Sequence, residues 1–174
     1  MLPEQVRTLE GLNIAIQMEI DGKEFYAKSA EKSSNELGRN LLAALSAEED
    51  IHREVFIKIY KAIKDKKGWP EVDFHPDGGR GLRTIFSKAL EESSGELKIE
   101  VSELDTVEAA RKMEARTFDF YRSQWQKATE NAEREIYDKL AGQEQEHNLV
   151  LADYQEYLRN PAGWFVKKEH PHFD

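Results

Sequence analysis

Hydrophobic residues recur at steps of three and four along four long segments of the chain. This spacing places apolar side chains on one face of an α-helix, with polar residues on the opposite face. The predicted helices span about residues 4–32, 35–66, 104–129 and 132–158. Asn35 is a candidate N-cap of the second helix, and Pro161 ends the fourth. The pattern is typical of an all-α protein built from four long helices.

The segment between the second and third predicted helices, about residues 67–102, breaks this pattern with clusters of Gly and Pro. Within it, LRTIFSKALEE is predicted to form a short helix. A hairpin between antiparallel neighbours needs only a few residues. So long a connection predicts a crossover along the bundle, which makes the second and third long helices parallel. The tail, about residues 160–174, is expected to be irregular, and residues 1–174 to form one domain.

The two halves of the chain repeat one set of residues. In each half, a Glu is followed thirty residues later by a second Glu, and a His stands three positions after that. The two sets, displaced by 95 residues, are Glu19, Glu49 and His52, and Glu114, Glu144 and His147. A single Glu-x-x-His is weak, because Asp and Glu fill 34 of 174 positions. A duplicated set at matched spacing is a much stronger signal.

All four of these Glu residues fall on the apolar stripes of their helices. Charged side chains rarely occupy core positions without a partner, and four converging carboxylates would repel one another without a cation. Four carboxylates balance the charge of two divalent ions. Oxygen ligands with one imidazole per ion suit iron or manganese. The sequence therefore predicts a dinuclear metal site that holds iron or manganese.

Composition excludes several other kinds of function. Cys is absent, which removes disulfides, Fe–S clusters and thiolate zinc sites. The net charge of −9 argues against nucleic-acid binding, which needs a basic surface. No apolar run is long enough to span a membrane, and the first residues do not resemble a secretory signal. A cytoplasmic location is expected.

A few residues outside the ligand set carry weaker signals. Tyr26 and Tyr121 each lie two turns after a predicted ligand Glu. They are either hydrogen-bond donors to that carboxylate or amphipathic core residues. His75 in the crossover is expected to be solvated, and His170 and His172 in the tail to be exposed.

The ligand pattern resembles that of ferritin-like di-iron proteins, in which two helices give one Glu each and two give Glu-x-x-His. Within that superfamily the chain is most similar to the rubrerythrin family. The similarity is clearest in the segments MEIDGKEFYAKSAEKS, AEEDIHREVF and YLRNPAGWFVKKEHPHFD. It implies a ferritin-like four-helix bundle with a long crossover between the second and third helices.

The resemblance also implies roles for the ligands. Glu49 and Glu144 would bridge the two ions, Glu19 and Glu114 would be terminal ligands, and each His would cap one ion. Rubrerythrins with a C-terminal rubredoxin domain bind a further iron through Cys, which this chain lacks. They also carry an extra Glu one turn after the third-helix ligand, where this chain has Thr117.

By resemblance, the expected function is a non-haem di-iron oxidoreductase. It would reduce hydrogen peroxide, or oxygen, with electrons from an external donor such as rubredoxin, and a homodimer is expected. Two other classes stay open: a ferritin-like iron oxidase or iron store, and a non-catalytic helical scaffold or interaction module.

Overall fold

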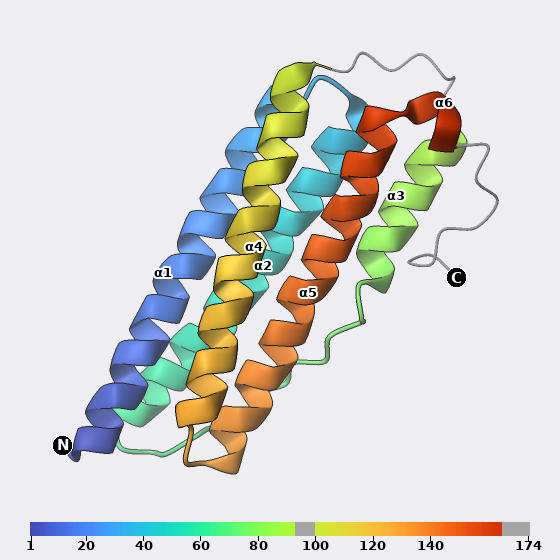
Figure 1. Cartoon of the computed structure of the whole chain (residues 1–174). Coiled ribbons are helices and arrows are strands. Elements are labelled where there is room, and N and C mark those ends of the chain that lie inside the picture. The colour runs from blue at the N-terminus through green and yellow to red at the C-terminus, as the bar shows by residue number, and fades with distance from the viewer. Residues whose placement is uncertain (93–99, 165–174) are drawn as a thin grey trace.

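The computed structural model describes residues 1–92 and 100–164, and these contain no strand. The long helices are α1 Pro3–Lys32, α2 Glu36–Lys64, α4 Val101–Lys127 and α5 Asn131–Arg159, and the short ones are α3 Arg80–Glu92 and α6 Pro161–Trp164. The long helices lie side by side in one bundle, with α1 and α5 running opposite to α2 and α4 (Figure 1). The predicted all-α, ferritin-like fold is confirmed.

Short turns join the antiparallel pairs α1/α2 and α4/α5. At the first turn the Asn35 side chain accepts a hydrogen bond from the backbone N–H of Gly38 at 2.7 Å. This bond satisfies one of the free N–H groups at the start of α2, so the predicted N-cap is present. The observed ends of the four long helices lie within one turn of the predicted ends.

The crossover between α2 and α4 carries the chain from one end of the bundle to the other (Figure 1). Helix α3 forms within it, beside α5, close to the predicted stretch. The Asp77 carboxylate starts this helix by accepting hydrogen bonds from the N–H groups of Gly79 and Gly81, each 2.9 Å long. The crossover makes α2 and α4 parallel, as its length predicted.

The hydrophobic core consists of two clusters of buried residues. One includes Leu42, Phe86 and Tyr154, and the other includes Phe56 and Leu140. Along each long helix, the predicted metal ligands fall between residues of the first cluster and residues of the second. The polar layer is therefore enclosed by apolar packing on both sides, which excludes bulk water from it.

The start of the tail differs from the expected irregular structure. Residues Pro161–Trp164 form the short helix α6, whose Trp164 ring packs edge-to-face against Phe86 at 5.4 Å between centroids. The Asn160 side chain accepts a hydrogen bond from the backbone N–H of Gly163 at 2.9 Å. This cap and the aromatic contact order the turn. Residues 165–174, including His170 and His172, lie outside the described residues.

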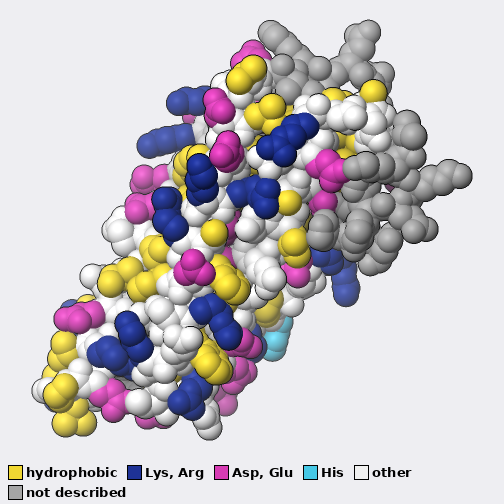
Figure 2. Space-filling model, viewed as in Figure 1, with side chains coloured by type: hydrophobic (Ala, Val, Ile, Leu, Met, Phe, Trp, Pro, Cys, Tyr) yellow, Lys and Arg dark blue, Asp and Glu magenta, His cyan; other side chains and the backbone are white. Residues whose placement is uncertain are grey.

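Charged side chains are mixed on the surface. On the face shown in Figure 2, acidic and basic residues alternate, and neither sign covers a broad area. None of the described helices combines the length and apolar character needed to cross a membrane.

Candidate metal centre

The six predicted ligands converge in the middle of the bundle, where each is at most 3% exposed. They form two overlapping groups, and within each group the ligand atoms lie within 4.8 Å of one another. The groups are Glu19, Glu49, His52 and Glu144, and Glu49, Glu114, Glu144 and His147. Glu49 and Glu144 belong to both. The bridging role that the family resemblance implied for these two residues stays a prediction.

The two histidines face the carboxylates in the same way. The Nδ1 atom of His52 lies 3.1 Å from Glu144 Oε1, and Nδ1 of His147 lies 2.9 Å from Glu49 Oε1. The two rings are stacked, with centroids 5.5 Å apart and planes 9° from parallel. The repeat in sequence therefore becomes an approximate two-fold arrangement of ligands.

Each of the six side chains has one buried polar atom without a hydrogen-bond partner among the described residues. These atoms are Glu19 Oε2, Glu49 Oε1, His52 Nδ1, Glu114 Oε2, Glu144 Oε1 and His147 Nδ1. Buried polar atoms are nearly always satisfied in folded proteins, and buried charges are paired or coordinate metals. One free atom on every predicted ligand is the arrangement expected around bound cations. The residues therefore fit a pair of metal ions held by four carboxylates and two imidazoles.

Burial and like charge act together on the two shared carboxyl groups. Burial raises the pKa of Glu49 well above its ordinary value, and the carboxylates of Glu19 and Glu114 raise it further. Burial and the neighbouring carboxylates also raise the pKa of Glu144. Without metal, these two groups favour the protonated form. Cations would compensate their charge and displace the protons.

Two other carboxyl groups shift the opposite way. Burial again disfavours the charged form of Glu19 and Glu114, but the imidazoles of His52 and His147 beside them lower their pKa on balance. Attraction to an adjacent imidazolium favours the carboxylate form. In the metal-free centre these two groups therefore favour the carboxylate form, whereas the two shared groups favour the protonated form.

Tyr26 and Tyr121 are hydrogen-bond donors in the site, but not to the carboxylates on their own helices. Tyr26 donates to Glu114, and Tyr121 donates to Glu19. Seven residues advance a helix by about 10 Å, too far for a phenol to reach back to its own ligand. Each ring extends instead to the facing helix. Burial, with the adjacent carboxylates, raises the pKa of both phenols, so both stay protonated donors.

The rubrerythrin family model matches residues 10–155, a region that contains all six converging residues. This chain belongs to the rubrerythrin family. Members of the family bind di-iron centres and are generally oxidoreductases, and the buried carboxylate and imidazole cluster fits that description. No match was found among curated proteins or among solved structures.

Glu48 is a residue of this rubrerythrin centre that sequence reasoning missed. Its Oε2 lies 2.6 Å from Nε2 of His147, on the side of the ring that faces away from the other carboxylates. Glu48 stands about 100° around the helix from Glu49 and lies in an acidic run, so it reads as a solvated residue. The one sequence feature that could have indicated Glu48 is its position next to the predicted ligand Glu49, on the helix that faces α5.

Phe74 was also missed, because it lies in the crossover, where no periodicity applies. Its buried ring meets the His52 ring edge-on, with centroids 5.8 Å apart and planes at 87°. The crossover therefore packs directly against one predicted ligand. No sequence pattern indicates which loop residue does so.

Gly22 and Thr117 occupy equivalent places in the two halves. A methyl group at Gly22 would lie 3.1 Å from Glu49 Oε2, so glycine leaves room for the shared carboxylate. The Thr117 hydroxyl donates to the backbone carbonyl of Met113 at 3.1 Å and so bonds within its own helix. At the position where the family resemblance implied an extra Glu, this chain thus contributes no further carboxylate.

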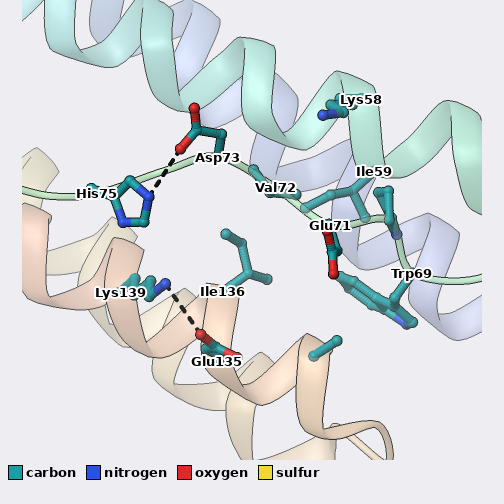
Figure 3. A pocket seen from close by; sticks show the side chains of 12 residues that line it. Lys58, Ile59, Trp69, Glu71, Val72, Asp73, His75, Glu135, Ile136 and Lys139 are labelled. Atoms are coloured by element: carbon teal, nitrogen blue, oxygen red, sulfur yellow. Dashed lines mark ion pairs between the residues drawn. The ribbon is translucent and has the colours of Figure 1, made fainter.

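A pocket of about 630 Å³ opens beside the first part of the crossover. It lies between α2, the loop at 69–75 and α5 (Figure 3). Ile59 and Ile136 form part of its apolar lining. His75, predicted to be solvated, is 83% exposed and lies 2.9 Å from Asp73. Phe74, between these two residues, is turned inward onto His52. One loop therefore has the pocket on one side and the candidate centre on the other.

Proposed function

We propose that this chain is a di-iron oxidoreductase that reduces hydrogen peroxide to water with electrons from an external donor. The observation that carries the proposal is the pair of overlapping ligand groups that share Glu49 and Glu144. Such sharing suits two ions held close together, and membership of the rubrerythrin family supports iron as the metal.

Reduction of one hydrogen peroxide to two waters consumes two electrons and two protons. A bound iron pair would supply one electron from each ion and a Lewis acid that polarises both peroxide oxygens. The chain contributes the charge balance and the geometry. Glu19 and Glu114 are held in place by phenol donors from the opposite half, and apolar clusters on both sides exclude bulk water.

The electrons must come from outside this chain. With no Cys, it cannot hold a rubredoxin-type iron that would relay electrons to the centre. A separate donor such as rubredoxin would fill this role. Oxygen is the competing oxidant, because a pair of ferrous ions can also reduce it.

Stopped-flow oxidation of the anaerobically loaded diferrous protein tests the proposal. Peroxide should oxidise the protein once, rapidly, and the reaction should then stop until rubredoxin and its NAD(P)H-linked reductase are added. Glu144→Gln should abolish this reaction. Glu135→Gln, on the exposed face of the same helix, should leave it unchanged.

Other outcomes would favour the competing functions. A reaction with oxygen that is much faster than the reaction with peroxide, followed by accumulation of ferric mineral, would identify an iron oxidase or store. Metal-loaded protein that reacts with neither oxidant would indicate a non-catalytic scaffold.

A further inference from the structure

The two halves place different groups behind the two histidines. Nε2 of His147 lies 2.6 Å from the Glu48 carboxylate. The residue equivalent to Glu48 in the other half, displaced by 95 positions, is Gln143. In the described part of the chain no hydrogen bond joins Gln143 to His52, whose ring instead meets the edge of Phe74. The predicted ligands are arranged symmetrically, but the side chains in contact with the two histidine rings are different.

Glu48 acts on His147 in two ways. A carboxylate that accepts a hydrogen bond from Nε2–H selects the tautomer whose lone pair is on Nδ1, the atom that faces the other carboxylates. It also makes the imidazole a stronger donor to a metal. The Glu48 side chain is 23% exposed and His147 is fully buried, so the interaction is partly shielded from water.

Gln143 cannot supply the same support to His52. Its amide is buried but carries no charge, so a hydrogen bond from it would be weaker than one from a carboxylate. The edge of Phe74 limits the freedom of the His52 ring by packing, but it offers no acceptor. Among residues 1–92 and 100–164, the His52 side of the centre therefore lacks the carboxylate–histidine pairing of the His147 side.

We infer that the two metal positions are unequal, and that Glu48 is a positioning residue that makes the position served by His147 the tighter one. The centre then fills in order, with the first ion on the His147 side and the second on the His52 side. This inference rests on the dinuclear site of the proposed function, and concerns binding rather than turnover. Loss of such a partner typically lowers metal affinity by about 10- to 100-fold.

Titration of the metal-free protein with Co²⁺, followed by its visible absorption and by competition with a chelator, tests this inference. Two ions that share bridging carboxylates bind in two steps even in a symmetric site, so the variants carry the argument. Glu48→Gln should weaken the first step by about 10- to 100-fold. Gln143→Glu should strengthen the second step, because it installs the missing carboxylate.

Asp50→Asn is the matched control. It removes the same charge from α2 two residues beyond Glu48, where the carboxylate bonds to Lys23 and Arg53 rather than to a ligand. It should change either step by no more than about threefold, the scale of a screened surface charge. Equal weakening by Glu48→Gln and Asp50→Asn would overturn the inference, because charge alone would then explain the effect.

Histidine variants test the order of filling. His147→Ala should weaken the first step, and His52→Ala should leave it unchanged and remove the second. The reverse result would overturn the inference while leaving the dinuclear site and its peroxide chemistry intact. Unequal binding that follows this pattern in a protein inert to peroxide would overturn only the proposed function. A protein that binds no Co²⁺ would overturn both.

Discussion

The α1/α2 half and the α4/α5 half carry the same three predicted ligands, yet their surroundings differ within a single turn. Lys23 and Asp50 form an ion pair at 2.9 Å that joins α1 to α2. Their equivalents in the other half are Phe118 and Gln145, which carry no charge. A pair of cations requires matched donors from both halves, whereas the neighbouring residues need only fill space and satisfy their own polar groups.

The packing around Tyr26 and Tyr121 also differs between the two halves. Tyr121 lies in an aromatic cluster, with its ring centroid 5.4 Å from Phe56 and 5.9 Å from Tyr137. The residue equivalent to Tyr137 in the first half is Leu42, which belongs to the other core cluster, with Tyr26. Both phenols nevertheless bond to a ligand carboxylate. The common polar layer is thus compatible with two differently packed ends of the core.

The largest expected effect comes from removing a carboxylate that both halves share. Glu144 belongs to both ligand groups, so Glu144→Ala should lose most of both ions. His147→Ala should lose mainly one, because this side chain belongs to a single group. Metal content per chain after anaerobic reconstitution, measured by elemental analysis, distinguishes the two. Wild-type protein that saturates at a single ion would contradict the shared site.

Metal removal should make stability depend on pH. The raised pKa values of Glu49, Glu144 and His147 mean that their protonated forms stabilise the folded, metal-free state. For the two carboxyl groups this contribution is complete below their ordinary pKa of 4.5 and is lost as the pH rises through the raised values. The lowered pKa values of Glu19 and Glu114 contribute stability that is lost on acidification, but only as the pH falls below about 4.5.

The melting temperature of metal-free protein should therefore rise as the pH falls from neutral towards about 5. Loaded protein should be the more stable at neutral pH, by about 3 kcal/mol for each site at free metal a hundredfold above its Kd. Differential scanning calorimetry of both forms across this range provides the measurement. A metal-free melting temperature that falls steadily on mild acidification would contradict the expectation.

The crossed tyrosine bonds give a smaller effect that reports on each half separately. Tyr26→Phe removes the donor to Glu114 and should weaken the ion on the His147 side. Tyr121→Phe removes the donor to Glu19 and should weaken the ion on the other side. Each loss should be about tenfold or more, from the removal of one support to a ligand. Co²⁺ titration of the two variants checks the crossing, with Tyr60→Phe as a control at a partly buried position of α2 outside the centre. If Tyr26→Phe instead weakened the ion on the His52 side, or Tyr121→Phe the ion on the His147 side, the crossed arrangement would be contradicted.

The sequence was sufficient to predict which six side chains converge, because their signal is local to each helix. Spacing alone puts Glu49 and Glu144 on apolar stripes, and charge on such a stripe demands a partner. The parallel arrangement of α2 and α4 followed from the length of the crossover. These inferences need only the helical repeat and the length of one connection, and the structure confirms the fold on which they depend.

Interactions that depend on which helix faces which were beyond the sequence. The acceptor of Tyr26 is on another helix, so its identity required the assembled bundle. Glu48 lies off the stripe, and its role exists only because His147 of α5 meets it. Phe74 belongs to a loop, whose path no periodicity describes. The helical start of the tail was missed because its order comes partly from the contact of Trp164 with Phe86, which is far away in the sequence.

The smallest expected effect concerns the ion pair that only the first half possesses. Lys23→Ala removes the contact to Asp50 between α1 and α2, but the side chains are 42% and 31% exposed, and Arg53 still bonds Asp50 at 2.8 Å. A solvated pair of this kind contributes about 0.2–1 kcal/mol. Chemical denaturation of the metal-free protein should show a loss within that range, and it should shrink further in 0.5–1 M salt, where the charges are screened. Both Co²⁺ steps should stay within about threefold of the wild-type values, because Lys23 contacts no ligand atom and its charge is screened. If Lys23→Ala lowered the free energy of unfolding by several kcal/mol, or weakened one metal position alone, this expectation would be wrong. The ion pair, which only the first half possesses, would then contribute to the difference between the two metal positions.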